Sequence, residues 1–174
     1  MMDRQLSSSI ASWKAEGVMA STSRGVDCVF LSCFDQNFRF FASMFGLEGI
    51  RLHRACTIEM ADFLLLATRG TVLVTDTTCL DGSWEDALAM IRTFHPLVGT
   101  LICADVVDRE FVTKAREHGA FDVLWRPIEL ERLRPSIRAA HEAASERRLW
   151  LVEREHERTS RRHSCPGSCL ETVQ

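Results

Sequence analysis

The chain alternates short apolar runs with longer segments in which apolar residues recur every three or four positions. Five of the apolar runs are predicted to be strands, at 28–33, 50–55, 71–75, 97–103 and 121–125. Most of them are apolar throughout, which is typical of strands covered on both faces. The run at 50–55 alternates between apolar and polar residues, which indicates a half-buried edge strand.

Capping residues indicate where the intervening helices begin. Asp35, Thr57, Ser83 and Asp108 each precede a segment of helical spacing, and an oxygen there can accept from the first free N–H groups of a helix. Ser83 is also followed by Asp86 three residues later, in the pattern of a capping box. The predicted helices therefore cover 36–47, 58–67, 84–93 and 109–118.

A further helix is predicted after Pro127. Its apolar positions are spaced by three, four, three and four residues, and they are Leu130, Leu133, Ile137, Ala140 and Ala144. This spacing predicts a helix with one stripe on the core. An interior proline removes a backbone donor, so Pro135 fits only near the helix start. The charged stretch after residue 145 could continue the helix into solvent, where a projecting Trp150 indicates a contact surface.

Five strands alternating with five helices predict an α/β fold. The expected architecture is a doubly wound, five-stranded parallel sheet of order 2-1-3-4-5 with helices on both faces. We expect this domain to occupy residues 26–145, after a flexible leader at 1–25. A charged tail at 146–174 follows, first as a helix extension and then as a disordered segment. In such sheets the functional site lies at the carboxyl ends of the strands.

Composition narrows the function classes. The 174 residues include 24 acidic and 21 basic side chains, so the formal net charge of −3 gives no reason to expect a nucleic-acid partner. No apolar run approaches the roughly 20 residues that span a bilayer. The N-terminal residues lack the apolar stretch of a signal peptide. We therefore expect a cytoplasmic protein without membrane or nucleic-acid partners.

The seven cysteines are an odd number, which argues against a closed disulfide framework. Five of them accompany apolar segments and are interpreted as reduced core thiols: Cys28, Cys33, Cys56, Cys79 and Cys103. The tail carries His156, His163, Cys165 and Cys169, which are ligand types suited to zinc. Their spacing is not that of a zinc finger, so disorder is the favoured interpretation of that segment.

The carboxyl ends of the predicted strands carry Ser32 and Cys33, Asp76, Ala104, and Arg126 with Pro127. The segment Val-Leu-Val-Thr-Asp that ends at Asp76 resembles the receiver domain of bacterial response regulators. The run Gly-Ala-Phe-Asp-Val-Leu-Trp-Arg-Pro at 119–127 is similar to that family's Gly-Ala-x-x-Tyr-Leu-x-Lys-Pro segment. The resemblance covers roughly residues 27 to 145.

This resemblance implies that Asp76 accepts a phosphoryl group from a histidine kinase. It also implies an acidic pair that holds Mg²⁺, at the position of Ser32 and Cys33, and a Ser or Thr at the position of Ala104. The family's Lys corresponds to Arg126, and the peptide bond before Pro127 is implied to be cis. The partners implied are a histidine kinase or phosphotransfer protein and a downstream protein.

Several of these positions depart from the family pattern. Without the acidic pair, Asp76 and the nearby Asp35 are the candidate Mg²⁺ ligands, and only weak binding is expected. Ala104 has no hydroxyl for an acyl phosphate, and Val123 replaces the switching aromatic residue. The planar fork of Arg126 favours a bidentate hold on a carboxylate and could lock Asp76 in a permanent ion pair.

Two hypotheses therefore remain open. The first is a receiver of a two-component phosphorelay that is phosphorylated on Asp76 and signals through protein contacts. The alternative is a pseudo-receiver that acts as an interaction module without phosphorylation. We expect no enzyme activity. No Gly-rich phosphate loop follows the first strand, so a nucleotide-binding site would lack its phosphate cradle. Cys33 could be a nucleophile, but no His is placed by sequence to activate it, and a buried thiol is the favoured interpretation.

Overall fold

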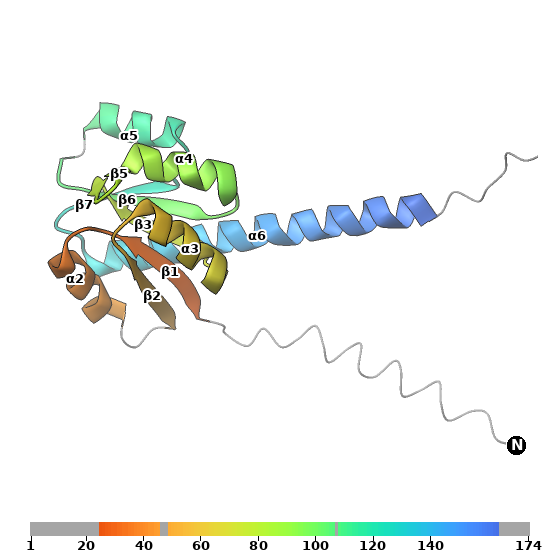
Figure 1. Cartoon of the computed structure of the whole chain (residues 1–174), viewed down its shortest axis with the longest axis horizontal. Helices are drawn as coiled ribbons and strands as arrows, with labels where there is room; N and C mark the ends of the chain where they lie inside the picture. The colour runs from red at the N-terminus through yellow and green to blue at the C-terminus, as the bar shows by residue number, and fades with distance from the viewer. Residues whose placement is uncertain (1–24, 46–48, 107, 164–174) are drawn as a thin grey trace, which may run out of the picture.

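A five-stranded parallel sheet forms the centre of the computed structural model, which describes residues 25–45, 49–106 and 108–163. The strands are β1 (Val26–Leu31), β2 (Ile50–Ala55), β3 (Val72–Asp76), β6 (Gly99–Ala104) and β7 (Asp122–Trp125). Their order is β2-β1-β3-β6-β7, as Figure 1 shows. The predicted order 2-1-3-4-5 is therefore confirmed, because β6 and β7 are the fourth and fifth strands of this sheet.

Helices cover both faces of the sheet (Figure 1). They are α2 (Asp35–Phe45), α3 (Ile58–Thr68), α4 (Trp84–Phe94), α5 (Arg109–Glu117) and α6 (Leu130–His163). Buried residues of α2 and α6 pack with Phe30, Val74 and Leu101 on one face. On the other face, α3 and α4 pack with strand residues such as Leu73. Successive strand residues thus enter opposite cores, which explains why these runs are apolar throughout.

The capping signals are largely confirmed. The side chains of Thr57 and Asp108 accept from backbone N–H groups as N-caps, and Ser83 with Asp86 forms the complete capping box. Asp35 is the exception. It is the first residue of α2 rather than its N-cap, and its carboxylate pairs with two arginines instead. The acidic side chain still lies where the positive end of the helix dipole favours it.

A small hairpin between β3 and α4 was not anticipated by the sequence analysis, which has only a loop there. It consists of β4 (Thr78–Cys79) and β5 (Gly82–Ser83), which pair in antiparallel fashion. The N–H of Leu80 donates to the carbonyl of Cys56 at 3.2 Å, which ties the hairpin to the chain after β2. Strands of two residues are too short to leave a sequence signal.

The predicted stripe on α6 is confirmed, because Leu133, Ile137, Ala140 and Ala144 are all fully buried. The helix runs through Pro135 and extends far beyond the domain (Figure 1). It approaches β6 closely, since a Cβ on Gly99 would lie 2.8 Å from the Cβ of Ala140. None of the described helices is both long enough and apolar enough to cross a membrane.

Two of the five cysteines interpreted as core thiols, Cys28 and Cys103, are buried in the sheet. Cys33 and Cys56 are only half-buried and follow β1 and β2, whereas the half-buried Cys79 lies in β4 and packs against the core cluster that contains Leu73. All five are free thiols. The interpretation as core residues therefore applies fully to Cys28 and Cys103 and in part to Cys79.

Three expectations concern the ends of the chain. The leader, apart from Gly25, and the tail residues Cys165 and Cys169 lie outside the described residues. The same is true of the side chain of His163. The continuation of the last helix past residue 145 is observed, since α6 extends to His163.

Acid should weaken the connection between β1 and the edge strand β2. Arg51 donates two hydrogen bonds to Asp27, of 2.8 and 2.5 Å, and His53 lies 2.9 Å from the same carboxylate. The hydrogen bond from Arg51, followed by that from His53, lowers the pKa of Asp27 against the opposing effect of burial.

A carboxyl group with a lowered pKa stabilises the fold above its unfolded value, about 3.9. This contribution is lost as the pH falls through the folded value. We expect Asp27→Asn to lower the free energy of unfolding at neutral pH and to have a vanishing effect at low pH. Urea unfolding of both proteins across the acid range would measure this, and a pH-independent difference would contradict it.

Candidate functional site

The candidate site lies at the carboxyl edge of the sheet, around Asp76. Asp76 is the last residue of β3, Ser32 follows β1, and Arg126 follows β7. These strands are parallel, so their carboxyl ends meet at one edge. The Asp76 residue is only 3% exposed. The structure thus brings together three residues that the sequence analysis placed at strand ends.

Both carboxylate oxygens of Asp76 are engaged. The hydroxyl of Ser32 donates to Oδ2 at 2.5 Å, and the side-chain amide of Asn37 donates to the same oxygen at 2.8 Å. Arg126 donates from Nη2 to Oδ1 and forms an ion pair with it. A buried carboxylate needs such donors, because burial removes its hydration. Asp76 is therefore held by three side chains from three different segments.

Arg126 forms the ion pair that was expected with Asp76, but through one nitrogen rather than two. Its other terminal nitrogen, Nη1, lies 3.8 Å from Oδ1 of Asp105, which is a largely exposed side chain. The side chain of Arg126 is 23% exposed. Its backbone N–H donates to the carbonyl of Ala104 at 3.0 Å, and the peptide bond to Pro127 is cis, as the resemblance implied.

The second candidate metal ligand, Asp35, is paired elsewhere. Its carboxylate lies 2.7 Å from Nη2 of Arg39 and 2.6 Å from Nη1 of Arg54. Within the described residues, no group of three or more His, Cys, Asp or Glu side chains is arranged to hold a metal ion. Mg²⁺ prefers carboxylate and water oxygens in octahedral geometry. Side chains that donate hydrogen bonds to Asp76, or that carry a positive charge beside it, do not fit that cation.

The end of the neighbouring strand β6 provides no hydroxyl for an acyl phosphate. Ala104 ends β6 and is buried, with only a methyl group as its side chain. Val123, at the position of the family's switching aromatic residue, packs with Ile102 and Leu88 in the core beneath α4 and α5. In the family, these two positions are implied to carry the signal from the phosphate. Here both of them, Ala104 and Val123, have small apolar side chains.

Two thiols at the carboxyl edge, Cys103 and Cys79, are poor nucleophiles. Burial, and next the nearby charge of Asp76, raise the pKa of the Cys103 thiol far above its usual range. Burial raises the pKa of Cys79 to about 11. A thiol attacks as its thiolate, which is scarce at neutral pH under these conditions. Cys33 donates weakly to the carbonyl of Thr78 at 3.9 Å.

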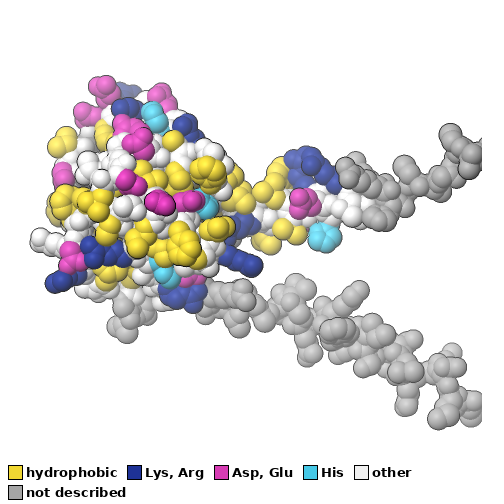
Figure 2. Space-filling model, in the orientation of Figure 1, with side chains coloured by type: hydrophobic (Ala, Val, Ile, Leu, Met, Phe, Trp, Pro, Cys, Tyr) yellow, Lys and Arg dark blue, Asp and Glu magenta, His cyan; other side chains and the backbone are white. Residues whose placement is uncertain are grey.

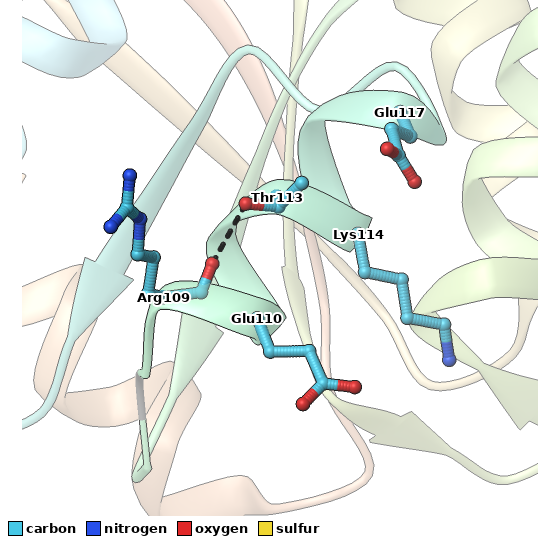
Figure 3. Close-up of a pocket in the computed structure, with 5 residues that line it drawn as sticks. All are labelled: Arg109, Glu110, Thr113, Lys114 and Glu117. Atoms are coloured by element: carbon cyan, nitrogen blue, oxygen red, sulfur yellow. Dashed lines mark hydrogen bonds between the residues drawn. The ribbon is translucent and has the colours of Figure 1, made fainter.

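Two hollows open on the surface, and one of them lies beside the site. One of about 490 Å³ lies beside Arg126 and is lined by Trp125, Pro127 and Arg132 among others. Another of about 530 Å³ lies on the outer face of α5, where Figure 3 shows the hydroxyl of Thr113 donating to the carbonyl of Arg109. Lys114 in that hollow pairs with Glu85 at 2.9 Å. Neither hollow contains Asp76.

Asn37 and Asp105 belong to the site but were missed in the sequence analysis. Asn37 lies 39 positions before Asp76, in the first turn of α2, and an amide side chain near a helix start is common. Asn37 could have been predicted from its position shortly after the first strand, because residues there lie at the carboxyl edge of the sheet. Asp105 directly follows β6 and carried the same signal.

Solved structures resemble this chain in fold. The signal receiver domain of an HD domain-containing protein from Pseudomonas fluorescens Pf-5 matches with a TM-score of 0.68 and 17% identity. The match covers 75% of this chain and 97% of that one. A response regulator receiver domain protein from Clostridium thermocellum matches with a TM-score of 0.61 and 18% identity, covering 67% and 94%.

The receiver domain of the Francisella response regulator 1452 is a further match, with a TM-score of 0.63 and 17% identity. It covers 68% of this chain and 98% of the matched chain. No protein-family model and no curated protein matches the sequence. The likeness to solved structures shows that the chain has the receiver fold, as the resemblance of its motifs implied.

Proposed function

We propose that this receiver-fold protein is a signalling module that acts through protein contacts and does not accept a phosphoryl group on Asp76. The observation that carries the proposal is the engagement of both Asp76 oxygens, by Arg126 on one and by Ser32 and Asn37 on the other. Each of these groups is a donor. Together they give each oxygen of the unphosphorylated carboxylate at least one hydrogen bond and leave neither oxygen free.

Phosphoryl acceptance needs more than a carboxylate at this place. The attacking oxygen must align with the phosphorus atom, and a cation must neutralise the charge on the phosphoryl oxygens. Here the positive charge belongs to Arg126 and is already paired with Asp76. Attack by Oδ1 would have to break that pair, and attack by Oδ2 would have to displace Ser32 and Asn37. The arrangement favours a fixed structural carboxylate.

The strand ends next to Asp76 support the same proposal. An acyl phosphate would find a methyl group at Ala104 in place of a hydroxyl donor. Val123 lacks the polar group and the size that a switching aromatic residue would use. A module built in this way would keep one conformation when a phosphodonor is present. Its output would then depend on which protein binds it.

The second candidate function is the phosphoacceptor role in a two-component phosphorelay. Two observations favour it. Asp76 ends β3 in a receiver fold, and the cation Arg126, which follows β7, lies beside it. A histidine kinase or phosphotransfer protein would then be the phosphodonor, and a weakly bound Mg²⁺ would be required. This candidate needs Arg126 to leave the carboxylate when the phosphodonor binds.

The partners we propose are proteins. Charged side chains of both signs are mixed over the visible face of the molecule, without one dominant sign (Figure 2). Such a surface has no evident complement to nucleic acid or to an anionic membrane. Trp150 is exposed on α6, where the guanidinium of Arg154 stacks over its ring at 4.5 Å, and it is a candidate contact. We further propose a cytoplasmic, non-enzymatic protein.

Treatment with a small phosphodonor tests the proposal. We expect no added phosphoryl group on the wild type after incubation with Mg²⁺ and acetyl phosphate, because both Asp76 oxygens are engaged. Intact-mass spectrometry would measure the product, and an ordinary receiver domain in the same reaction would show that the donor is active.

Two variants make the phosphodonor test sharper. Asp76→Asn removes the candidate acceptor, so a label on the wild type that this variant loses would overturn the proposal and support the phosphoacceptor role. The triple variant Ser32→Asp, Ala104→Thr, Arg126→Lys introduces one acidic residue of the implied pair, the implied hydroxyl and the implied Lys. A label on the triple variant alone would show that these three positions explain the difference.

A further inference from the structure

The outer side of α3 carries large apolar side chains that the sheet does not cover. Eight of the eleven residues of this helix are apolar. Ala61 and Leu65 are buried against the sheet, whereas Met60, Phe63 and Leu66 are 47%, 66% and 74% exposed. A helix that is apolar on all sides is normally buried on all sides. The composition of α3 therefore indicates that a further segment covers its outer side.

The three exposed residues of α3 form one stripe. Met60, Phe63 and Leu66 follow one another at spacings of three, so at about 100° per residue they lie within about a third of a turn. The buried Leu65 lies on nearly the opposite side of the helix from Phe63. The stripe therefore points away from the sheet.

The end of α4 adjoins this stripe. Nε2 of His95 lies 2.6 Å from Oδ1 of Asp62 on α3, and the preceding Phe94 is 68% exposed. Figure 2 shows hydrophobic side chains over α3 and the end of α4, with acidic side chains between them. Four exposed apolar residues make up what we call the α3 face: Met60, Phe63, Leu66 and Phe94.

The chain enters the domain beside one end of the α3 face. The N–H of Thr71, three residues after the end of α3, donates to the carbonyl of Asp27 at 3.3 Å. Asp27 is the second residue of β1, so the end of α3 lies next to the start of β1 (Figure 1). Trp13 lies twelve positions before Gly25. Twelve residues can span up to about 40 Å, which exceeds the roughly 16 Å length of α3.

Residues 1–24 contain side chains that complement this face. Ile10 and Trp13 are large apolar residues three positions apart, and Lys14 directly follows them. The segment has three basic and two acidic residues. On α3, Glu59 is exposed, and it has no ion-pair partner within the part of the chain that the structure describes. The segment therefore offers both apolar surface and a cation to the α3 face.

Attachment to the domain favours this segment over a separate molecule. A short tether keeps a segment near its binding surface at an effective concentration on the order of millimolar. A separate partner at micromolar concentration would need an affinity about a thousandfold higher to occupy the surface equally. Even a weak contact with the α3 face would thus be populated by residues of the same chain.

We propose that residues 10–19 of this chain bind the α3 face of the same molecule, with Trp13 against Phe63. Lys14 would then lie within reach of Glu59, which is one turn before Phe63 on α3. For these residues, the proposal replaces the expectation of a flexible leader with a defined binding surface on the domain. It does not depend on the function proposed for the site at the carboxyl edge.

Photo-cross-linking in the full chain tests this proposal. A benzophenone amino acid in place of Trp13 keeps an aromatic group there and, on irradiation, reacts with C–H groups that it touches. We expect a cross-link to the tryptic peptide 55–69, which contains all of α3. The product should have the mass of one chain, 19.7 kDa, and its yield should not change on tenfold dilution, because the contact lies within one molecule.

Two variants connect the yield to the α3 face. The double variant Phe63→Glu, Leu66→Glu should lower the cross-link yield by about tenfold or more, because covering a carboxylate removes its hydration. The matched control Phe40→Glu makes the same change on α2, at a residue that is 46% exposed and lies on the other side of the sheet, and should keep the yield. Circular dichroism confirms that each variant remains folded.

Four results would overturn the proposal. They are no cross-link, cross-links confined to peptides without a residue of the α3 face, a main product of two chain masses, and equal yields in the wild type and the double variant. A product of two chain masses that is joined through peptide 55–69 would assign the face to a second copy instead. The first three results concern the wild-type domain, so they stay decisive even if a variant unfolds.

Discussion

The variant Arg126→Met should lose about 3 kcal/mol of unfolding free energy at neutral pH. Removing one member of a buried ion pair costs about 3–5 kcal/mol, because the other charge stays buried without compensation. The lower end of that range applies here, since Ser32 and Asn37 continue to donate to Asp76. Methionine keeps much of the volume of the arginine stem, so the loss would report on the charge. Urea or guanidinium unfolding measures it.

A double-mutant cycle separates the Asp76–Arg126 interaction from other effects. Asp76→Asn alone leaves Arg126 without its carboxylate and should also be destabilising. Combined with Arg126→Met, it removes both charges, so the double variant should be more stable than the sum of the single losses predicts. We expect a coupling free energy of about 2 kcal/mol. Additive losses would mean that the pair does not hold the site together.

The cycle also bears on the proposed function. If Asp76 is fixed by its donors, variants that release it should be the ones that gain reactivity with a phosphodonor. Arg126→Lys keeps a positive charge but has a single flexible ammonium group in place of the planar fork. The extent of phosphorylation of Arg126→Lys by acetyl phosphate would be compared with that of Arg126→Met. The comparison would show whether the guanidinium is the group that blocks Asp76.

The second large effect is expected at the contact between α6 and the sheet. Ile137 is fully buried, in the cluster that contains Leu101 and Leu124. Truncation of such a side chain to alanine removes buried methyl groups and leaves a cavity, at a cost of 2–5 kcal/mol. We expect about 3 kcal/mol for Ile137→Ala, measured by chemical unfolding of the full chain.

The neighbouring residue provides the control for this prediction. Arg138 is exposed on the same turn of α6, so Arg138→Ala should change the unfolding free energy by no more than about 0.5 kcal/mol. Equal losses in the two variants would mean that the helix is not held by its apolar stripe. The close approach of Ala140 to Gly99 leaves little space for the helix to shift and fill the cavity.

Local sequence signals were sufficient for much of the fold. The caps at Thr57, Ser83 and Asp108 and the apolar stripe of α6 depend on residues within a turn or two of one another. The sheet order followed from the alternation of strands and helices, because right-handed crossovers leave few arrangements. These features are short-range, or they are limited by chain connectivity, so a single sequence carries them.

The site was predictable only in part. Parallel strands bring their carboxyl ends together, which placed Asp76, Ala104 and Arg126 at one edge. The pairing of Arg126 with Asp76 also followed from charge. The metal role considered for Asp35 depended on where its side chain turns, and the structure shows it paired with Arg39 and Arg54.

The sequence by itself determined the strands, the caps, the sheet order and the strand ends that carry the site. Only the tertiary structure decided that Asn37 donates to Asp76, that Asp35 turns to arginines, and that α6 leaves the domain with Leu149 exposed. The physical reason is range. Periodicity and capping act between neighbours in the chain, whereas the partner of a buried carboxylate depends on how distant segments pack.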